Sequence, residues 1–88
     1  MYLHLGQNTI VPEKTVIGIF DMDNTTGSRN TRNFLSNAER DGNVINVSDD
    51  LPKSFIVCHD KNKTIVYLSQ LASQTLQKRA GPILFERV

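Results

Sequence analysis

Short apolar runs bounded by turn residues recur along this chain, and they constrain its fold more than any other feature. The most apolar of these runs cover residues 15–20, 54–58 and 64–68. Runs of this length that are rich in Val, Ile and Phe are typical of buried strands. Residues 60–63 form a polar reversal between the last two runs, which favours a hairpin. The sequence therefore predicts a β-sheet, in which residues 15–20 form a central strand.

The N-terminal residues predict a second pair of strands. Apolar and polar side chains alternate over residues 2–5, which suits a half-buried strand, and residues 6–8 supply a turn. Residues 9–11 predict a return strand that Pro12 ends, because proline cannot donate to a strand ladder. A further short strand is expected over residues 44–47.

Two segments predict helices. Residues 28–41 hold helix formers, with Ser28 as the N-cap and Gly42 as the C-terminal stop. Residues 72–80 predict a shorter helix, which a Gly-Pro pair ends. Together with the strands, these helices predict an α+β fold: a small, mostly antiparallel β-sheet with one main helix and a short C-terminal helix.

The length of 88 residues allows one hydrophobic core, because chains of this size bury only about 60–65% of their unfolded surface. We therefore expect a single domain over residues 1–80 and a C-terminal tail over residues 81–88. Several strands are apolar on both faces, and the two helices are too short to cover a sheet. We expect a second copy of the chain to cover the rest, with the apolar residues 83–85 as a docking element.

The cysteine content and the lack of an apolar targeting segment indicate the cellular compartment. Cys58 is the single cysteine and cannot form an internal disulfide, which favours a reducing interior. The N-terminal residues have no basic region followed by an apolar run, and no run of 18 apolar residues follows. We expect a cytoplasmic protein without a membrane partner. The net charge of +1 does not by itself indicate nucleic-acid binding, so a binding surface requires segregated charges.

Five basic residues are the candidate nucleic-acid contacts. Arg29, Arg32 and Arg40 lie within about 80° of one another on the main predicted helix, opposite its apolar side. Lys14 and Lys53 lie near predicted turns. In one copy, a charged helix face is most often merely solvated. In a symmetric assembly, the same arginines recur at regular spacing and can follow a phosphate backbone.

Asp21 and Asp23 form the pattern Asp-x-Asp-x-Thr after an apolar strand, which resembles the first motif of haloacid-dehalogenase-type phosphatases. In that chemistry one aspartate attacks phosphorus, the other is general acid and base, and Mg²⁺ neutralises the phosphate oxygens. That fold needs a doubly wound parallel sheet, whose crossovers cost about 30 residues each. We therefore favour a strand-to-helix loop, whose carboxylates stabilise the N-terminal end of the main helix.

No other segment predicts a catalytic, metal or cofactor site. His59 and Cys58 are neighbours in a predicted strand, so their side chains point to opposite faces and cannot hold one metal ion. The five glycines are scattered and form no phosphate-binding loop. We expect a protein that is not an enzyme and that uses no cofactor.

Five segments resemble the RemA/RemB family of bacterial extracellular-matrix regulators, and its RemB branch most closely. The segments are Met1-Tyr2-Leu3-His4-Leu5-Gly6, Ile17-Gly18-Ile19-Phe20-Asp21, Pro52-Lys53-Ser54-Phe55-Ile56-Val57, Tyr67-Leu68-Ser69 and Thr75-Leu76-Gln77-Lys78-Arg79-Ala80. The resemblance spans residues 1–80 and implies a small cytoplasmic regulator of matrix and biofilm gene expression. Members of the RemA branch bind DNA and assemble into rings. The resemblance therefore implies a homo-oligomer, such as a ring, with double-stranded DNA or a RemA-like protein as further partner.

The basic positions of RemA-like members are matched here only in part. Those members carry a basic cluster before the penultimate strand, where this chain has Asp50-Leu51-Pro52-Lys53, so that only Lys53 keeps the charge. Their basic residue before the third strand falls here at Thr15, beside Lys14. The alternative to a DNA-binding regulator is therefore an oligomeric protein–protein interaction module without direct DNA binding.

Overall fold

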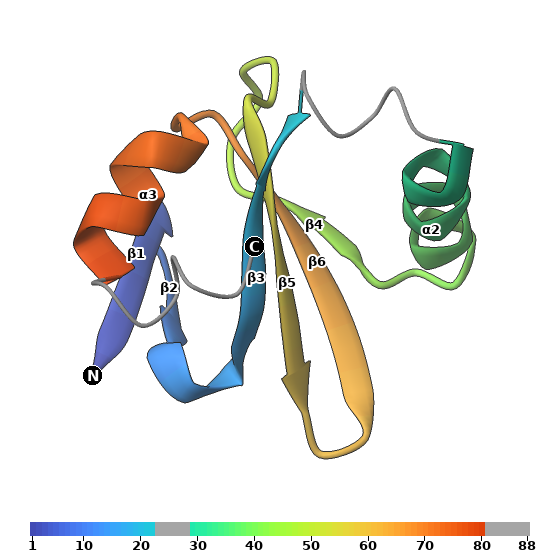
Figure 1. Cartoon of the computed structure of the whole chain (residues 1–88), viewed down its shortest axis with the longest axis horizontal. Helices are drawn as coiled ribbons and strands as arrows, with labels where there is room; N and C mark the ends of the chain where they lie inside the picture. The colour runs from blue at the N-terminus through green and yellow to red at the C-terminus, as the bar shows by residue number, and fades with distance from the viewer. Residues whose placement is uncertain (23–28, 81–88) are drawn as a thin grey trace.

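The strands and helices follow one another largely as the sequence predicts (Figure 1). A computed structural model describes residues 1–22 and 29–80 of the chain. The elements are β1 (Tyr2–Gly6), β2 (Thr9–Pro12), the short 3₁₀-helix η1 (Glu13–Thr15), β3 (Val16–Asp21), α2 (Arg29–Arg40), β4 (Val44–Asn46), β5 (Ser54–Asp60), β6 (Lys63–Ser69) and α3 (Ser73–Ala80). The predicted α+β class is confirmed. In the described residues, no helix is long and apolar enough to span a membrane.

The strands form two separate sheets. The main sheet has the order β3-β5-β6-β4, in which β4 runs parallel to β6 and the other pairs are antiparallel. Strands β1 and β2 form an antiparallel hairpin of their own. The prediction of a central strand over residues 15–20 is therefore wrong. Because the N-terminal hairpin does not extend the main sheet, β3 pairs only with β5 among residues 1–22 and 29–80 and lies at the edge of the sheet that they form.

Two turns follow the predicted chemistry. Lys61 and Asn62 adopt positive φ angles of 52° and 65°, as a two-residue hairpin between right-twisted strands requires. Gly42 has a φ of 76° and follows the end of α2, where the Asn43 N–H donates to the Ala38 carbonyl at 2.8 Å. Ser28, the predicted N-cap, lies outside the described residues.

One face of the main sheet packs against the β1–β2 hairpin and α3 (Figure 1). Leu3 and Leu5 of the hairpin, Ile56 of β5 and Leu76 of α3 are fully buried in this layer. From the sequence, only the two helices were expected to cover the sheet within one chain. The hairpin adds a second covering element, so this face is closed within one chain.

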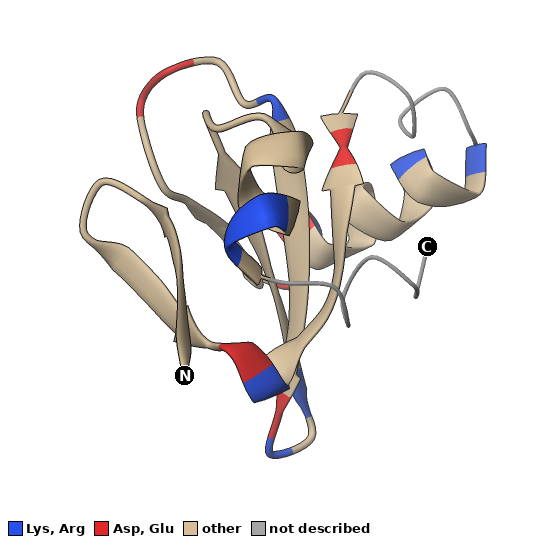
Figure 2. Cartoon of the chain, turned by 60° about the vertical axis from the view of Figure 1, so that its left-hand side comes forward, with Lys and Arg blue, Asp and Glu red and all other residues tan. Residues whose placement is uncertain are grey.

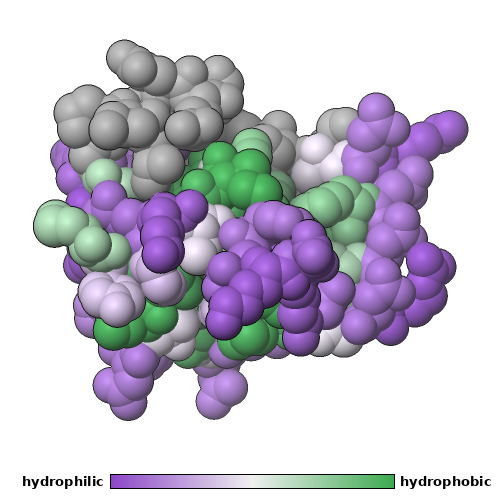
Figure 3. Space-filling view, turned by 90° about the horizontal axis from the view of Figure 1, so that it is seen from below, coloured by the Kyte–Doolittle hydropathy of each residue, from purple (hydrophilic) through white to green (hydrophobic). Residues whose placement is uncertain are grey.

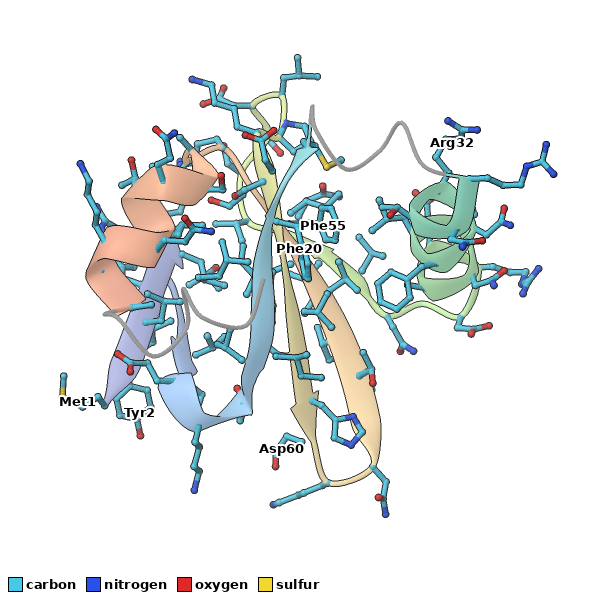
Figure 4. All side chains as sticks on the ribbon, viewed as in Figure 1. Met1, Tyr2, Phe20, Arg32, Phe55 and Asp60 are labelled. Atoms are coloured by element: carbon cyan, nitrogen blue, oxygen red, sulfur yellow. The ribbon has the colours of Figure 1, made fainter. Side chains whose placement is uncertain are left out.

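The other face of the main sheet packs against α2. Phe55, Val57 and Val66 are buried there. Of the predicted apolar side of α2, which is Phe34, Leu35 and Ala38, the last two pack against them, whereas Phe34 is 40% exposed. The rings of Phe20 and Phe55 stack with their centroids 5.0 Å apart (Figure 4). No described residue of α2 is fully buried, so α2 lies loosely on the sheet. The predicted docking element, residues 83–85, lies outside the described residues.

Candidate nucleic-acid interface

The three candidate arginines lie on α2, and all are exposed. Arg29 and Arg32 belong to its first turn, and Arg40 is its last residue, about 16 Å further along the helix axis. Figure 4 shows the Arg32 side chain at the N-terminal end of α2, where it extends beyond the end of the helix. Leu35 and Ala38 face the sheet from the same helix, which turns the arginine side to solvent.

The last turn of α2 holds its arginine in place. The Arg40 guanidinium donates a hydrogen bond of 2.9 Å to the side-chain oxygen of Asn37. Its neighbours in the chain, Glu39 and Asp41, are exposed carboxylates that offset part of the positive charge. The first turn has no acidic residue, so the positive charge of α2 is greatest at its N-terminal end, near Arg29 and Arg32.

Lys14 and Lys53 lie at opposite ends of β3. Lys14 is exposed in η1, just before β3 begins. The backbone of Lys53 is held at the other end, because its carbonyl accepts from the Met22 N–H at 2.9 Å and its N–H donates to the Ser69 carbonyl at 2.8 Å. Six residues of strand separate the two ends by about 20 Å. One copy therefore does not bring the two lysines together.

Acidic residues accompany both lysines. Glu13 precedes Lys14, and Asp49 and Asp50 lie in the loop before Lys53. Figure 2 shows red and blue segments side by side at η1 and, at the other end of the molecule, on the same loop before β5. In the described part of one copy, the five candidate residues thus occupy three separate places rather than one continuous basic surface.

Asp21 is the last residue of β3 and is partly buried. Strand β3 is an edge strand with one antiparallel neighbour, whereas the phosphatase motif follows a strand inside a parallel sheet. Asp23, the second residue of that motif, lies outside the described residues. Within residues 1–22 and 29–80, no three His, Cys, Asp or Glu side chains are close enough to hold a metal ion.

Cys58 and His59 point to opposite faces of β5, as predicted. Cys58 is buried, and His59 is exposed with its Nδ1 atom 2.9 Å from the Thr64 hydroxyl. Burial raises the pKa of the Cys58 thiol, and a hydrogen bond with Thr15 lowers it by less. Burial also raises the pKa of Tyr67, with a smaller contribution from Cys58. The thiol therefore stays protonated at neutral pH and is a poor nucleophile.

An apolar groove that the sequence did not predict lies between α2 and the main sheet. The groove has a volume of about 400 Å³ and is lined by Ile17, Phe20, Asn30, Thr31, Phe34, Phe55 and Val57. Beside the groove, the register of β3 shifts, because Val16 pairs with Cys58 but Gly18 pairs with Val57. Ile17 is left half exposed between them. Gly18 within the strand was the sequence signal for this bulge.

The comparisons with known proteins agree on one family. A family model described as extracellular matrix regulatory protein A-like matches residues 2–80. Extracellular matrix regulatory protein B of Bacillus subtilis (strain 168) is 34% identical over 80 residues, which cover 91% of this chain and 90% of that protein. The match includes every described strand and helix. The chain belongs to the RemA-like family of extracellular matrix regulatory proteins.

Proposed function

We propose that this chain is a cytoplasmic, non-enzymatic regulatory protein of extracellular-matrix and biofilm gene expression. The proposal rests on its place in the RemA-like family and on its similarity to extracellular matrix regulatory protein B along most of both chains. We propose further that it acts as a homo-oligomer that contacts the phosphates of double-stranded DNA. The observation that carries this second step is the exposed arginine face of α2.

Three arginines suit phosphate contacts but are too few to bind duplex DNA tightly. A guanidinium donates two parallel hydrogen bonds to a phosphate and stays charged at every physiological pH. Each neutralised phosphate contributes to affinity mainly by releasing counterions, so affinity grows with the number of contacts. One copy offers Arg29, Arg32 and Arg40 on α2. A self-assembled oligomer repeats this set and raises the effective concentration of each further contact.

Retardation of a generic duplex at several salt concentrations tests the DNA part of the proposal. The variant Arg29→Ala/Arg32→Ala/Arg40→Ala is expected to fold, because exposed substitutions usually cost within about 0.5 kcal/mol. It is expected to bind more weakly and with a shallower salt dependence than the wild type. The matched control Arg29→Lys/Arg32→Lys/Arg40→Lys keeps each charge and is expected to keep the salt dependence. If the affinity of the alanine variant depends on salt as steeply as that of the wild type, the arginine face of α2 does not contact DNA and is merely solvated.

The second candidate function is that of an oligomeric protein–protein interaction module, which regulates without binding DNA directly. The observation that favours it is the exposed Asp50 and Leu51 before β5, where the RemA-like pattern described above has basic residues. Its partner would be a RemA-like protein or further copies of this chain. A stable oligomer that fails to retard any duplex at low salt would favour this function over DNA binding.

A further inference from the structure

A pocket of mixed character lies at the end of the molecule that carries the chain's first residue and the β5–β6 turn (Figure 4). We call it the basal pocket. Its volume is about 480 Å³, and it is lined by Met1, Tyr2, Pro12, Lys14, Thr15, Asp60 and Lys61. Figure 3 views the molecule from this end and shows hydrophobic surface among hydrophilic side chains.

The walls of the basal pocket are fixed by backbone contacts, although the apolar side chains are open to solvent. The Glu13 N–H donates to the Met1 carbonyl at 3.0 Å, and Tyr2 pairs with Pro12 in the hairpin. The side chains of Met1 and Tyr2 remain 94% and 67% exposed. Met1 and Tyr2 therefore leave apolar surface open to a partner at the pocket.

The opposite end of the molecule carries a loop of complementary character, residues 48–52. Leu51 is 86% exposed at this loop, and its neighbours Asp49 and Asp50 are exposed as well. The Asp50 N–H donates to the Ser48 hydroxyl at 3.0 Å, and the backbone of Lys53 is bonded to β6 directly after the loop. The loop therefore presents an apolar side chain beside two carboxylates from an anchored base.

We propose that the 48–52 loop of one copy docks into the basal pocket of the next copy. Leu51 would lie against Met1 and Tyr2, while Asp49 and Asp50 face Lys14 and Lys61. This inference rests on the self-assembly in the proposed function and names the surfaces that form it. In both ribbon views the 48–52 loop lies at one end of the molecule, and η1 and the β5–β6 turn, which carry residues of the pocket, lie at the other end (Figures 1 and 2). The contact therefore joins different copies head to tail and generates a ring or a row.

The charges favour this direction of assembly over its alternatives. The basal pocket is lined by two lysines and one carboxylate, Asp60, and Glu13 lies next to Lys14 in the chain. The charged residues of the 48–52 loop are both acidic, and Lys53 follows the loop directly. A contact between two loops would bring four carboxylates together. A contact between two pockets would bring the lysines of one copy against the lysines of the other. Opposite patches steer association and like patches suppress wrong contacts. The loop-to-pocket contact is thus the pairing in which opposite charges meet.

The same contact changes the layout of the basic residues. In one copy, Lys14 and Lys53 are separated by the length of β3. At a head-to-tail junction, Lys53 follows the docked loop of one copy, and Lys14 lines the pocket of the next. The two lysines that one copy separates then belong to the same junction.

The variant Leu51→Asp tests the loop side of the contact. Burying a leucine side chain favours association by about tenfold or more, so the concentration for half-assembly should rise by at least that factor. Ile45→Asp is the matched control, because Ile45 is also exposed but lies on the edge strand β4. Light scattering over a concentration series measures the assembly of both variants, and circular dichroism checks that each variant is folded. Equal assembly of Leu51→Asp and the wild type would overturn the inference.

A mixing experiment tests whether the loop and the pocket meet each other. Leu51→Asp keeps an intact pocket, and Tyr2→Asp/Lys61→Glu keeps an intact loop. Each variant alone is expected near the monomer mass of 9.9 kDa. Their mixture has one working junction and is expected to give a 1:1 complex that grows no further. A mixture that stays monomeric, or a pocket variant that assembles like the wild type, would contradict the head-to-tail contact.

These results separate the inference from the proposed function. Assembly that survives both the loop and the pocket substitutions would refute this junction, while the regulatory function by another interface would stand. A wild type that stays monomeric would refute both. Assembly that depends on Leu51, without retardation of duplex DNA at low salt, would support this junction and refute the DNA contact alone.

Discussion

The Ser69 hydroxyl donates a hydrogen bond of 2.7 Å to the Leu5 carbonyl, which joins the end of β6 to the N-terminal hairpin across 64 residues of sequence. The same oxygen accepts from the Leu71 N–H at 3.0 Å. Ser69 and Leu5 are fully buried. No water can replace this hydroxyl without opening the contact between the hairpin and the main sheet.

Replacing Ser69 by Ala is therefore expected to lower the free energy of unfolding by about 1–3 kcal/mol, because it leaves a buried acceptor and a partly buried donor without a partner. Urea denaturation measures the change. Ser36→Ala, at an exposed position of α2, is the matched control and should stay within about 0.5 kcal/mol of the wild type. Similar stability of the two variants would show that the Ser69 contact is dispensable.

Gly18 is required by the aromatic stack on the α2 face. A Cβ atom at this position would lie 2.7 Å from the ring of Phe20, which stacks on Phe55. Gly18→Ala is expected to destabilise the fold by about 1–3 kcal/mol, as overpacking does. A double-mutant cycle with Phe20→Leu tests whether contact with the Phe20 ring causes this loss of stability. The cost of Gly18→Ala should shrink in the Phe20→Leu background, and an equal cost in both backgrounds would rule out the clash.

Because the Cys58 thiol is buried, we expect the free energy of unfolding to fall at alkaline pH. Its pKa is raised above the ordinary value of 9.0 because burial penalises the thiolate. As pH rises, the unfolded chain loses this proton first, so the folded state becomes less favoured. Between about pH 8 and about pH 10, the wild type should lose more unfolding free energy than Cys58→Ala, in which this thiol is absent. If the unfolding free energies of the two proteins fall in parallel as pH rises, the Cys58 thiol is not buried in the folded state.

Asp21 is expected to have no catalytic role. It ends an edge strand of a mostly antiparallel sheet, and we expect it to stabilise the entry to α2 together with Asp23. Calorimetry should detect no Mg²⁺ binding at millimolar concentration. Mg²⁺-dependent release of phosphate from a generic phosphomonoester, abolished by Asp21→Asn, would establish the phosphatase alternative.

The sequence predicted most elements because their signals are local. The reversal at residues 60–63, the stop at Gly42 and the apolar side of α2 each depend on a few neighbouring residues. The edge position of β3 was missed because it depends on how the hairpin packs, which no local pattern encodes. The basal pocket was missed for a similar reason, since Tyr2 and Lys61 meet only through the tertiary fold.

The candidate basic residues show the same division. Helical periodicity places Arg29, Arg32 and Arg40 on one side of α2, and all three are exposed in the structure. Periodicity says nothing about distances between elements, so it did not reveal that Lys14 and Lys53 lie at opposite ends of β3. Within the described residues of one copy, these five candidates therefore form no continuous basic path.

The salt dependence of duplex affinity, measured at a concentration where the protein is assembled, tests this account most directly. Each neutralised phosphate adds about −0.9 to the slope of log affinity against log salt, so the three α2 arginines of one copy give a slope of about −2.7 at most. If an assembly binds DNA, we expect a steeper slope, because several α2 helices would then contact one duplex. A slope no steeper than this value, or no binding at low salt, would contradict the claim that assembly builds the DNA-binding surface.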